Sequence, residues 1–325
     1  MTRRRAPGPA RRALLAGLAP PFLRHAARAD WPERPVRLVA PFPAGSGTDL
    51  LARLLAQALS EDSGQPFVVE NRPGGNGVVG SAAAAAAPPD GHTLLMLGTS
   101  AAAINPHVLR RLPYDPIRDF APIGAIAEQP YVLVVAPDAP GKNLQSWLEG
   151  VRARPKEVTL AYGNAGSQIM AAMLARGAGL RVTAVPYRGS AEAIVDVSVG
   201  TVDCTFADFG IGMAQQRAGR LRALAESAVR PFALAPEVPP LASVVPGFDA
   251  NVWFGLVTPA AVPPEMLAGA SVRLDAALVS PRFEDKLAGL GLAPLRMGPE
   301  ALGEHIRRQL ALWGDRVRLA GIEPQ

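Results

Sequence analysis

Short apolar runs that alternate with helix-forming segments are the feature that most restricts how this sequence can fold. Between residues 36 and 257 these runs are four to seven residues long and rich in β-branched side chains, which is typical of buried strands. Strand–helix alternation of this kind predicts parallel α/β sheets. We expect strands over residues 36–42, 67–70, 93–97, 131–137, 158–162, 182–187, 202–208, 221–225 and 251–257. We expect helices over residues 48–60, 78–87, 143–153, 167–178, 190–199, 265–289 and 299–319.

The length of the chain adds a second restriction. A sequence of 325 residues is longer than one average domain and is expected to form about two domains. No serine-rich or glycine-rich linker divides the sequence into two parts. We therefore expect the chain to cross between two α/β domains inside ordered strands.

The first 29 residues differ from the rest in charge. They contain seven arginines and no acid, so residues 30–325 hold 26 Lys and Arg against 28 Asp and Glu, and the net charge of +5 comes from this leader. The main argument for nucleic-acid binding is thereby removed. A charged start, an apolar run over residues 13–19 and the small-x-small sequence 27–29 predict a signal peptide over residues 1–29 and a periplasmic protein. Arg11-Arg12 also resembles a twin-arginine signal, while a basic tail or a wrongly assigned start codon is the alternative.

Motifs for other chemistries are incomplete. Residues 75–80 match G-x-G-x-x-G, but "NRPG" separates them from the preceding strand and no acid follows at the spacing that a ribose needs. No glycine loop leads into Lys-Ser or Lys-Thr, and the four histidines form no ligand-spaced pair, so we expect neither phosphate transfer nor a metal site. No run of 18 apolar residues follows the leader. The single cysteine, Cys204, lies in an expected strand and is interpreted as a core thiol.

Four loops share small and hydroxyl residues between an expected strand end and a helix start. They are "PAGSGTD" (43–49), "LGTSAA" (97–102), "YGNAGSQ" (162–168) and "PYRGSAE" (186–192). In open α/β sheets such carboxyl-end loops form the ligand crevice. Because helix N-termini present unpaired N–H groups, these loops suit a small carboxylate. Ordinary helix capping by the same residue types is the alternative.

Eight phrases spread along the chain carry a resemblance to a known family. They are "WPERPVRLVAPFPAGSGTDLLARLLA", "VVENRPGGNGVVG", "PPDGHTLL", "INPHVLRRLPYDPIRDFAPI", "VPYRGSAEAI", "GRLRALA", "WFGLVTPAAVP" and "WGDRVRLAGIEP". In this order the chain resembles the periplasmic substrate-binding proteins of tripartite tricarboxylate transporters, the TctC or Bug family. The resemblance implies a type II periplasmic-binding-protein fold, with two α/β lobes and an inter-lobe ligand cleft. Lobe 1 would comprise residues 30–130 and 253–325, lobe 2 residues 131–252, and the runs 131–137 and 251–257 would cross between them.

The resemblance also implies where a ligand binds. Lobe 1 would contribute the backbone of Ala44, Gly45, Ser46 and Gly47, together with Thr48, Asp49, Thr99 and Ser100. Lobe 2 would contribute Gly163, Asn164, Gly166, Ser167, Tyr187, Arg188, Gly189 and Asp208. For Asp49 the alternative is that it caps its own helix, and for Arg188 that it is a solvated loop arginine.

The function implied is capture of a small carboxylate by lobe closure and its delivery to the membrane permease subunits of a tripartite transporter. Family ligands include di- and tricarboxylates, acidic amino acids and aromatic acids. Gln168, where the family commonly has histidine, is compatible with a less polar acid. We expect a monomer that performs no chemistry, with no cofactor. An orphan receptor that serves a sensor kinase is one alternative, and an enzyme on the same fold with Cys204 or Ser167 as nucleophile is another.

Overall fold

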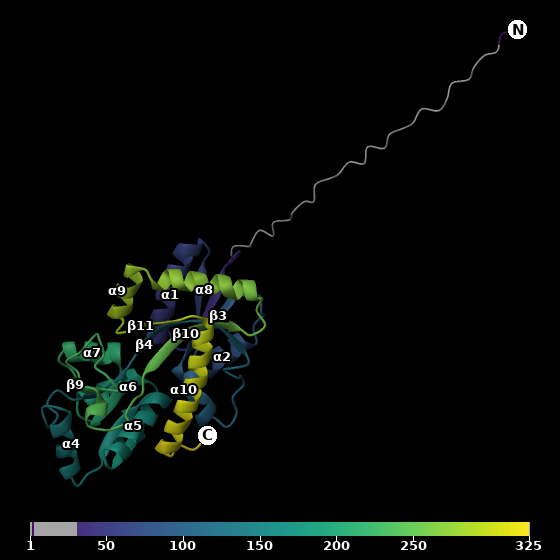
Figure 1. Ribbon diagram of the computed structural model, residues 1–325. Coiled ribbons are helices and arrows are strands. Elements are labelled where there is room, and N and C mark those ends of the chain that lie inside the picture. Colours follow the sequence, from purple (N-terminus) through teal and green to yellow (C-terminus); the bar gives the residue numbers. More distant parts are fainter. Residues whose placement is uncertain (1, 3–30, 325) are drawn as a thin grey trace. The chain divides into compact units, whose positions relative to one another are not determined.

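The structure is a computed structural model that describes Thr2 and residues 31–324, and among these residues the strands form two sheets (Figure 1). The predicted signal peptide, apart from Thr2, lies outside the described residues. Sheet A has the strand order β11-β4-β10-β3-β1-β2. Its strands are β1 (Val36–Ala40), β2 (Phe67–Asn71), β3 (Thr93–Gly98), β4 (Phe120–Gln129), β10 (Val252–Pro259) and β11 (Ala293–Met297).

Sheet B has the strand order β7-β6-β8-β5-β9. As predicted, β1 runs parallel to β2 and β3, and β6 runs parallel to β7 and β8. However, β10 and β5 are antiparallel to their neighbours, so both sheets are mixed. The chain enters these two strands from the other sheet, without the crossover helix that returns a chain to the parallel direction. The strands of sheet B are β5 (Tyr131–Val135), β6 (Val158–Tyr162), β7 (Val182–Pro186), β8 (Cys204–Asp208) and β9 (Arg222–Glu226).

The helices cover both faces of each sheet, and the predicted α/β fold with two sheets is confirmed. The helix expected over residues 265–289 is divided at Pro281, which lacks the N–H that a continuous helix would use. Short helical turns lie at Gly75–Gly77, Ser100–Ile104 and Leu241–Ser243. The α-helices are α1 (Gly47–Ser63), α2 (Val78–Ala85), α3 (Asn105–Val108), α4 (Leu144–Ala153), α5 (Ala165–Gly177), α6 (Ser190–Ser198), α7 (Phe209–Arg217), α8 (Pro264–Leu278), α9 (Pro281–Gly289) and α10 (Pro299–Ala320).

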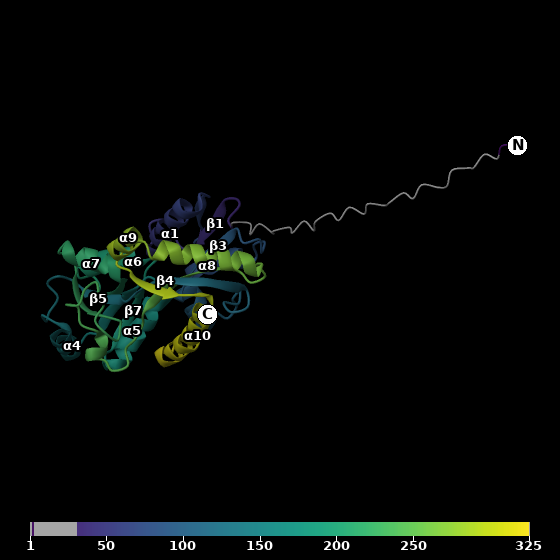
Figure 2. The same cartoon turned by 45° about the horizontal axis from the view of Figure 1, so that its top comes forward.

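Apolar clusters fill the space between the sheets and their helices. In sheet A, Leu38 packs in a cluster with α1, α8 and α9, whereas Leu97 on the other face packs with α2 and α10. In sheet B, Leu160 packs with α4 and α5, and Val132 on the other face packs with α6 and α7. The cluster that Leu160 forms with α4 and α5, which we call the α5 cluster, also contains Trp313 of α10. Helix α10 therefore packs on sheet A and also reaches the core of sheet B (Figures 1 and 2).

The chain passes between the sheets at two adjacent places, which we call the crossing segments. The first leads from β4 into β5, and the second leads from β9 toward β10. Ser227 joins them. Its N–H donates to the Tyr131 carbonyl and its hydroxyl accepts from the Tyr131 N–H, both at 2.8 Å. Its carbonyl accepts from the Ala250 N–H and its hydroxyl donates to the Ala250 carbonyl, both at 2.9 Å, so one buried serine fixes the two crossing segments to each other.

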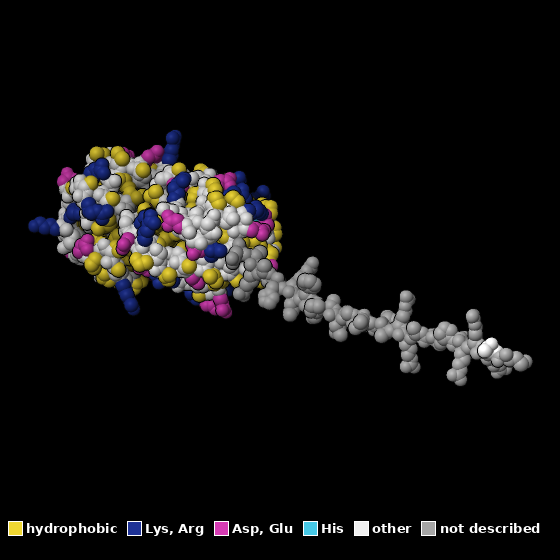
Figure 3. Space-filling model, turned by 90° about the horizontal axis from the view of Figure 1, so that it is seen from above, with side chains coloured by type: hydrophobic (Ala, Val, Ile, Leu, Met, Phe, Trp, Pro, Cys, Tyr) yellow, Lys and Arg dark blue, Asp and Glu magenta, His cyan; other side chains and the backbone are white. Residues whose placement is uncertain are grey.

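The surface carries charges of both signs. Figure 3 shows Lys and Arg side chains interspersed with Asp and Glu on the face seen from above. This mixture agrees with the nearly balanced charge of residues 30–325, where 26 basic residues stand against 28 acids. Of the helices in the part of the chain described by the structure, none has the length and the apolar character needed to cross a membrane.

Candidate functional site

The first predicted loop, residues 43–49, lies at the carboxyl end of β1. Gly45 has a φ of +82°, in the left-handed region that favours glycine, and this residue turns the chain toward α1. Ser46 is the N-cap of α1. Its N–H donates to the Pro43 carbonyl at 3.1 Å, and its hydroxyl accepts from the Asp49 N–H at 3.3 Å. These two bonds satisfy two of the four N–H groups that an α-helix leaves open at its start.

The N–H groups of Gly47 and Thr48 are the two that remain. Both lie in the first turn of α1, where the helix offers no carbonyl partner, and within the described chain neither has another one. A Cβ at Gly47 would meet no atom within 4 Å, so the space beside the loop is open. The first turn of α1 therefore presents two unpaired donors at the positive end of the helix dipole.

Asp49 holds this loop in place. Its carboxylate accepts from the Gly45 N–H and from Asn71 Nδ2, both at 2.8 Å, and from Arg53 Nε at 3.0 Å. Burial acts to raise the pKa of Asp49, but the hydrogen bonds from Arg53, Gly45 and Asn71, with the Arg53 charge, hold the pKa below its usual value. Asp49 thus stays ionised, and its oxygens are occupied by the protein itself. The helix cap that was considered for Asp49 is supplied by Ser46.

Thr99 and Ser100 follow β3. The Thr99 hydroxyl accepts from the Trp253 N–H at 2.9 Å and lies 3.4 Å from the Trp253 carbonyl, to which it donates. Thr99 is 1% exposed, so its side chain completes the pairing of β3 with β10 instead of facing open space. Ser100 is partly buried and begins a single π-helical turn, Ser100–Ile104.

The loop after β6 repeats the arrangement at the start of α1. Asn164 is the N-cap of α5, and its Oδ1 accepts from the Ser167 N–H at 2.9 Å. The Asn164 N–H donates to the Ser167 hydroxyl at 3.3 Å, which completes a capping box. The N–H groups of Ala165 and Gly166 are left without a partner in the described part of the chain. Both predicted polar side chains, Asn164 and Ser167, therefore act on their own helix.

The loop after β7 lies against the loop after β6, because a Cβ at Gly163 would clash with the backbone of Gly189. Tyr187 donates its hydroxyl to Asp196 at 2.6 Å, and this bond, with burial and the Asp196 charge, raises the pKa of Tyr187 to about 12. Arg188 is exposed, and its backbone N–H donates to Glu192 at 3.3 Å. Gly189 faces open space, since a Cβ there would meet no atom within 4 Å.

The predicted residues fall into two groups, one at each sheet. Residues 44–49 and 99–100 lie at the carboxyl ends of β1 and β3, while residues 163–167, 187–189 and Asp208 lie at the carboxyl ends of β6, β7 and β8. Within each group the loops are brought together by parallel neighbouring strands.

Three residues at these loops were missed from the sequence. Asn71 and Arg53 hold Asp49, and the Tyr131 hydroxyl lies 3.4 Å from Asn164 Oδ1. The only signal for Asn71 was its place in "VVENRPG", directly after a strand. Arg53 and Tyr131 carried no signal, because each meets its partner through the folded structure.

The groups considered as nucleophiles are engaged or buried. Burial raises the pKa of Cys204, which disfavours a thiolate. The Ser167 hydroxyl donates to the Asn164 carbonyl at 2.9 Å. Within residues 31–324, His92 and His107 hydrogen-bond to backbone carbonyls, and no cluster of three His, Cys, Asp or Glu residues has the geometry to hold a metal ion.

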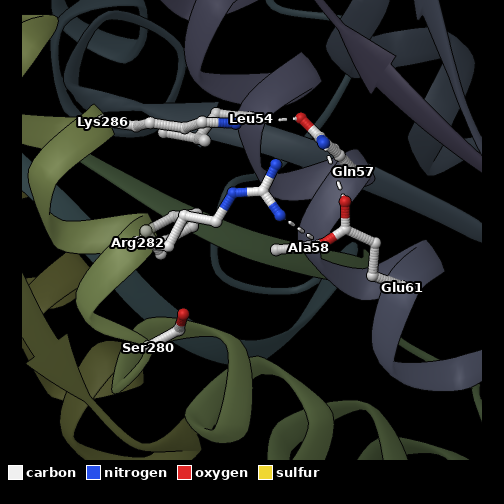
Figure 4. Close-up of a pocket in the computed structure, with 8 residues that line it drawn as sticks. Leu54, Gln57, Ala58, Glu61, Ser280, Arg282 and Lys286 are labelled. Atoms are coloured by element: carbon white, nitrogen blue, oxygen red, sulfur yellow. Dashed lines mark hydrogen bonds and ion pairs between the residues drawn. The ribbon is translucent and has the colours of Figure 1, made fainter.

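A pocket between α1 and α9 lies farther along α1 (Figure 4). Gln57, on its wall, follows Gly47 by ten residues, which is about 15 Å along a helix. Four polar side chains of the pocket wall bond to one another. Arg282 lies 3.5 Å from Glu61, Gln57 donates to Glu61 at 2.8 Å, and Lys286 donates to Gln57 at 3.2 Å. We do not assign this pocket as the site, because Gln57, Glu61, Arg282 and Lys286 already bond to one another across it.

The chain is similar to known proteins in sequence and in fold. Residues 51–322 match a family model described as tripartite tricarboxylate transporter family receptor. Protein BugT of Bordetella pertussis is 32% identical over 313 residues, covering 95% of this chain and 94% of BugT. The structure of R. palustris Rpa4515 with adipate has a TM-score of 0.85 at 32% identity, covering 91% of this chain and 100% of that chain. MatC (Rpa3494) from Rhodopseudomonas palustris with bound malate has a TM-score of 0.79 at 27% identity, covering 88% and 100%.

Proposed function

The chain belongs to the tripartite tricarboxylate transporter receptor family, and on this premise we propose that it captures a small carboxylate in a cleft between two lobes. It then presents the ligand to the permease subunits of a tripartite transporter in the periplasm, after export by residues 1–29. The protein acts by binding and needs no catalytic residue, metal or cofactor. Two relatives of known structure hold such acids, adipate in Rpa4515 and malate in MatC.

One observation carries this proposal. The starts of α1 and α5 are built alike, because in each a cap fixes the turn and leaves the next two N–H groups unpartnered among the described residues. These donors are Gly47 and Thr48 in one helix and Ala165 and Gly166 in the other. Two N–H groups match the two oxygens of a carboxylate, and the helix dipole adds attraction. One carboxylate would sit at each helix start, which suits a dicarboxylate.

The four N–H groups can supply the free energy that micromolar binding requires. A hydrogen bond to a charged group contributes roughly 1.5–3 kcal/mol, and micromolar affinity requires about 8 kcal/mol. Four such bonds contribute roughly 6–12 kcal/mol, a range that includes this value. Because neutral N–H groups supply the binding, no buried cation is required, and the exposed Arg188 is not needed to hold the ligand.

The proposed lobes follow from this arrangement. We assign residues 30–130 and 253–325 to lobe 1 and residues 131–252 to lobe 2, so each lobe contributes one helix start. In lobe 1, Asp49 and Ser46 shape the loop, and in lobe 2 Asn164 and Ser167 do so. Closure of the lobes would bring both pairs of donors onto one ligand.

A thermal-shift and calorimetric screen of residues 30–325 against C4–C6 dicarboxylates, amino acids and aromatic acids tests the function. A ligand at ~100 times its dissociation constant should add about 2.7 kcal/mol to the stability of the protein. If none of the acids stabilises protein that is free of co-purified ligand, the proposal is refuted.

A matched pair of variants tests the site. Gly47→Leu places a side chain in the open space beside the α1 donors and should abolish binding without unfolding the protein. Gly150→Leu makes the same change in α4, where a Cβ also meets no atom within 4 Å, and should bind as the wild type does. Equal affinities for the two variants would show that α1 is not part of the site.

A further inference from the structure

Asp208 is a carboxylate without a partner. It ends β8 and occupies the N-cap position of α7, yet its side chain makes no capping bond. Asp208 is partly buried and its side chain forms no hydrogen bond or ion pair with the rest of the described chain, and this burial raises the pKa of Asp208 to about 6. An aspartate at an N-cap normally accepts from its own helix, whereas the Asp208 carboxylate is free to accept from a donor outside the protein.

The pairing of the strands places Asp208 on the face of sheet B that carries the start of α5. Asp208 lies directly opposite Tyr131 in an antiparallel pair, and residues opposite each other share a face of the sheet. The Tyr131 hydroxyl lies 3.4 Å from Asn164 Oδ1, and a Cβ at Gly166 would lie 3.0 Å from the same hydroxyl. Tyr131, which shares a face with Asp208, therefore contacts the α5 turn.

The core clusters independently place Asp208 on the face of sheet B that carries α5. Phe206, two residues before Asp208, packs with Tyr131 in the α5 cluster, whereas Ala207 packs on the opposite face. Side chains alternate along a strand with a period of two, so Asp208 shares the face of Phe206. The carboxylate and the two free N–H groups of α5 thus lie on the same face, at the same end of the sheet.

A ligand with carboxylates alone does not satisfy this arrangement. Its oxygens would be attracted to the α5 N–H groups, but they would also approach the negative charge of Asp208, which is mostly ionised at neutral pH. A hydroxyl or ammonium beside the ligand carboxylate would instead donate to Asp208. That hydrogen bond would supply the partner that the protein itself does not provide.

We propose that Asp208 is a specificity-determining residue that selects carboxylates bearing a hydrogen-bond donor, a hydroxyl or an ammonium, next to the carboxylate bound at α5. This inference rests on the proposed carboxylate-binding function and narrows its ligand class. It distinguishes malate from succinate and aspartate from succinate, which differ only in that donor.

Isothermal titration at pH 7.5 tests the inference with acids of equal chain length: succinate, malate and aspartate, then glutarate, 2-hydroxyglutarate and glutamate. The wild type should bind the best donor-bearing acid at least tenfold more tightly than its plain homologue. Asp208→Asn should weaken that acid and strengthen the plain one, so that the ratio falls to about threefold or less. Asp138→Asn, an exposed carboxylate in the same lobe, makes the same charge change and should leave the ratio unaltered.

The outcomes separate the two claims. A loss of folding alone would lower the affinity for all the acids together. If Asp208 selects the ligand, the substitution lowers the affinity for donor-bearing acids and raises the affinity for plain acids. Equal affinities for plain and donor-bearing acids in the wild type would overturn the inference and leave the function intact, and so would an unchanged ratio in Asp208→Asn. If none of the six acids binds, but another carboxylate of the wider screen does, the selection of these donors is overturned and the function stands. If no acid of any kind binds, both are overturned.

Discussion

Replacing Glu226 by Gln should stabilise the protein above neutral pH. Glu226 is 0% exposed at the end of β9, and its Oε1 accepts from the Phe232 N–H at 2.6 Å, while its Oε2 has no partner. Burial raises the pKa of Glu226 to about 7, the nearby charge of Glu237 adds to this, and the Phe232 bond acts against it. Gln keeps the acceptor for Phe232 and has the shape of the protonated acid.

The size and sign of this change in the free energy of unfolding follow from proton linkage. Below about pH 4.5 the carboxyl is protonated in the folded and the unfolded chain, so it does not affect stability. As the pH rises to about 7, the unfolded chain has lost the proton and the folded chain still holds it, so the free energy of unfolding falls. A pKa that moves from 4.5 to about 7 corresponds to a loss of about 3 kcal/mol, complete above pH 7.

Thermal and urea unfolding of wild type and Glu226→Gln between pH 4 and 8 measures this loss. The two proteins should be about equally stable at pH 4, and the variant should be more stable by up to about 3 kcal/mol at pH 8, or roughly 5 °C in Tm. Glu237→Gln, an exposed carboxylate nearby, should change stability by less than about 0.5 kcal/mol. Parallel pH profiles for wild type and Glu226→Gln would refute the reasoning.

Two further changes test the crossing segments and the α1 loop. Ser227→Ala leaves the buried Tyr131 N–H and Ala250 carbonyl without their hydroxyl partner, so urea denaturation should show a loss of roughly 2–4 kcal/mol; a loss below about 1 kcal/mol would contradict the role of Ser227. Asp49→Asn removes the charge that pairs with Arg53 beside the Gly45 N–H, and should weaken carboxylate binding roughly tenfold in calorimetry while circular dichroism stays unchanged. Unchanged affinity would mean that the loop keeps its shape without that charge.

The fold could be predicted largely from the alternation of strand and helix patterns. The elements that the prediction missed have local causes in the sequence. β4 was missed because Pro122 and Gly124 interrupt an otherwise apolar run, and α7 because Gly210 and Gly212 lower its helix propensity. The antiparallel direction of β5 and β10 could not be deduced, because direction depends on how the chain enters a sheet and not on the residues within the strand.

The loops of the candidate site were predicted from the sequence, but the hydrogen bonds that their side chains form were not. Serine, threonine and asparagine cap helices with the same atoms that bind ligands, so sequence cannot separate the two uses. The structure assigns Ser167 to a capping box and Thr99 to the backbone of β10. Of the backbone and side-chain contacts that the sequence suggested, the backbone N–H groups at the starts of α1 and α5 are the ones left without a partner in the described chain.

The position of β10 in sheet A determines the order in which the two sheets can be completed during synthesis at the ribosome. Sheet B is formed from one continuous stretch, residues 131–226, and its strands are all available once that stretch has emerged. Sheet A has β10 between β3 and β4, so the nascent chain carries both with open edges until residues 252–259 are made. The half of the molecule that begins the sequence is therefore the last to be completed.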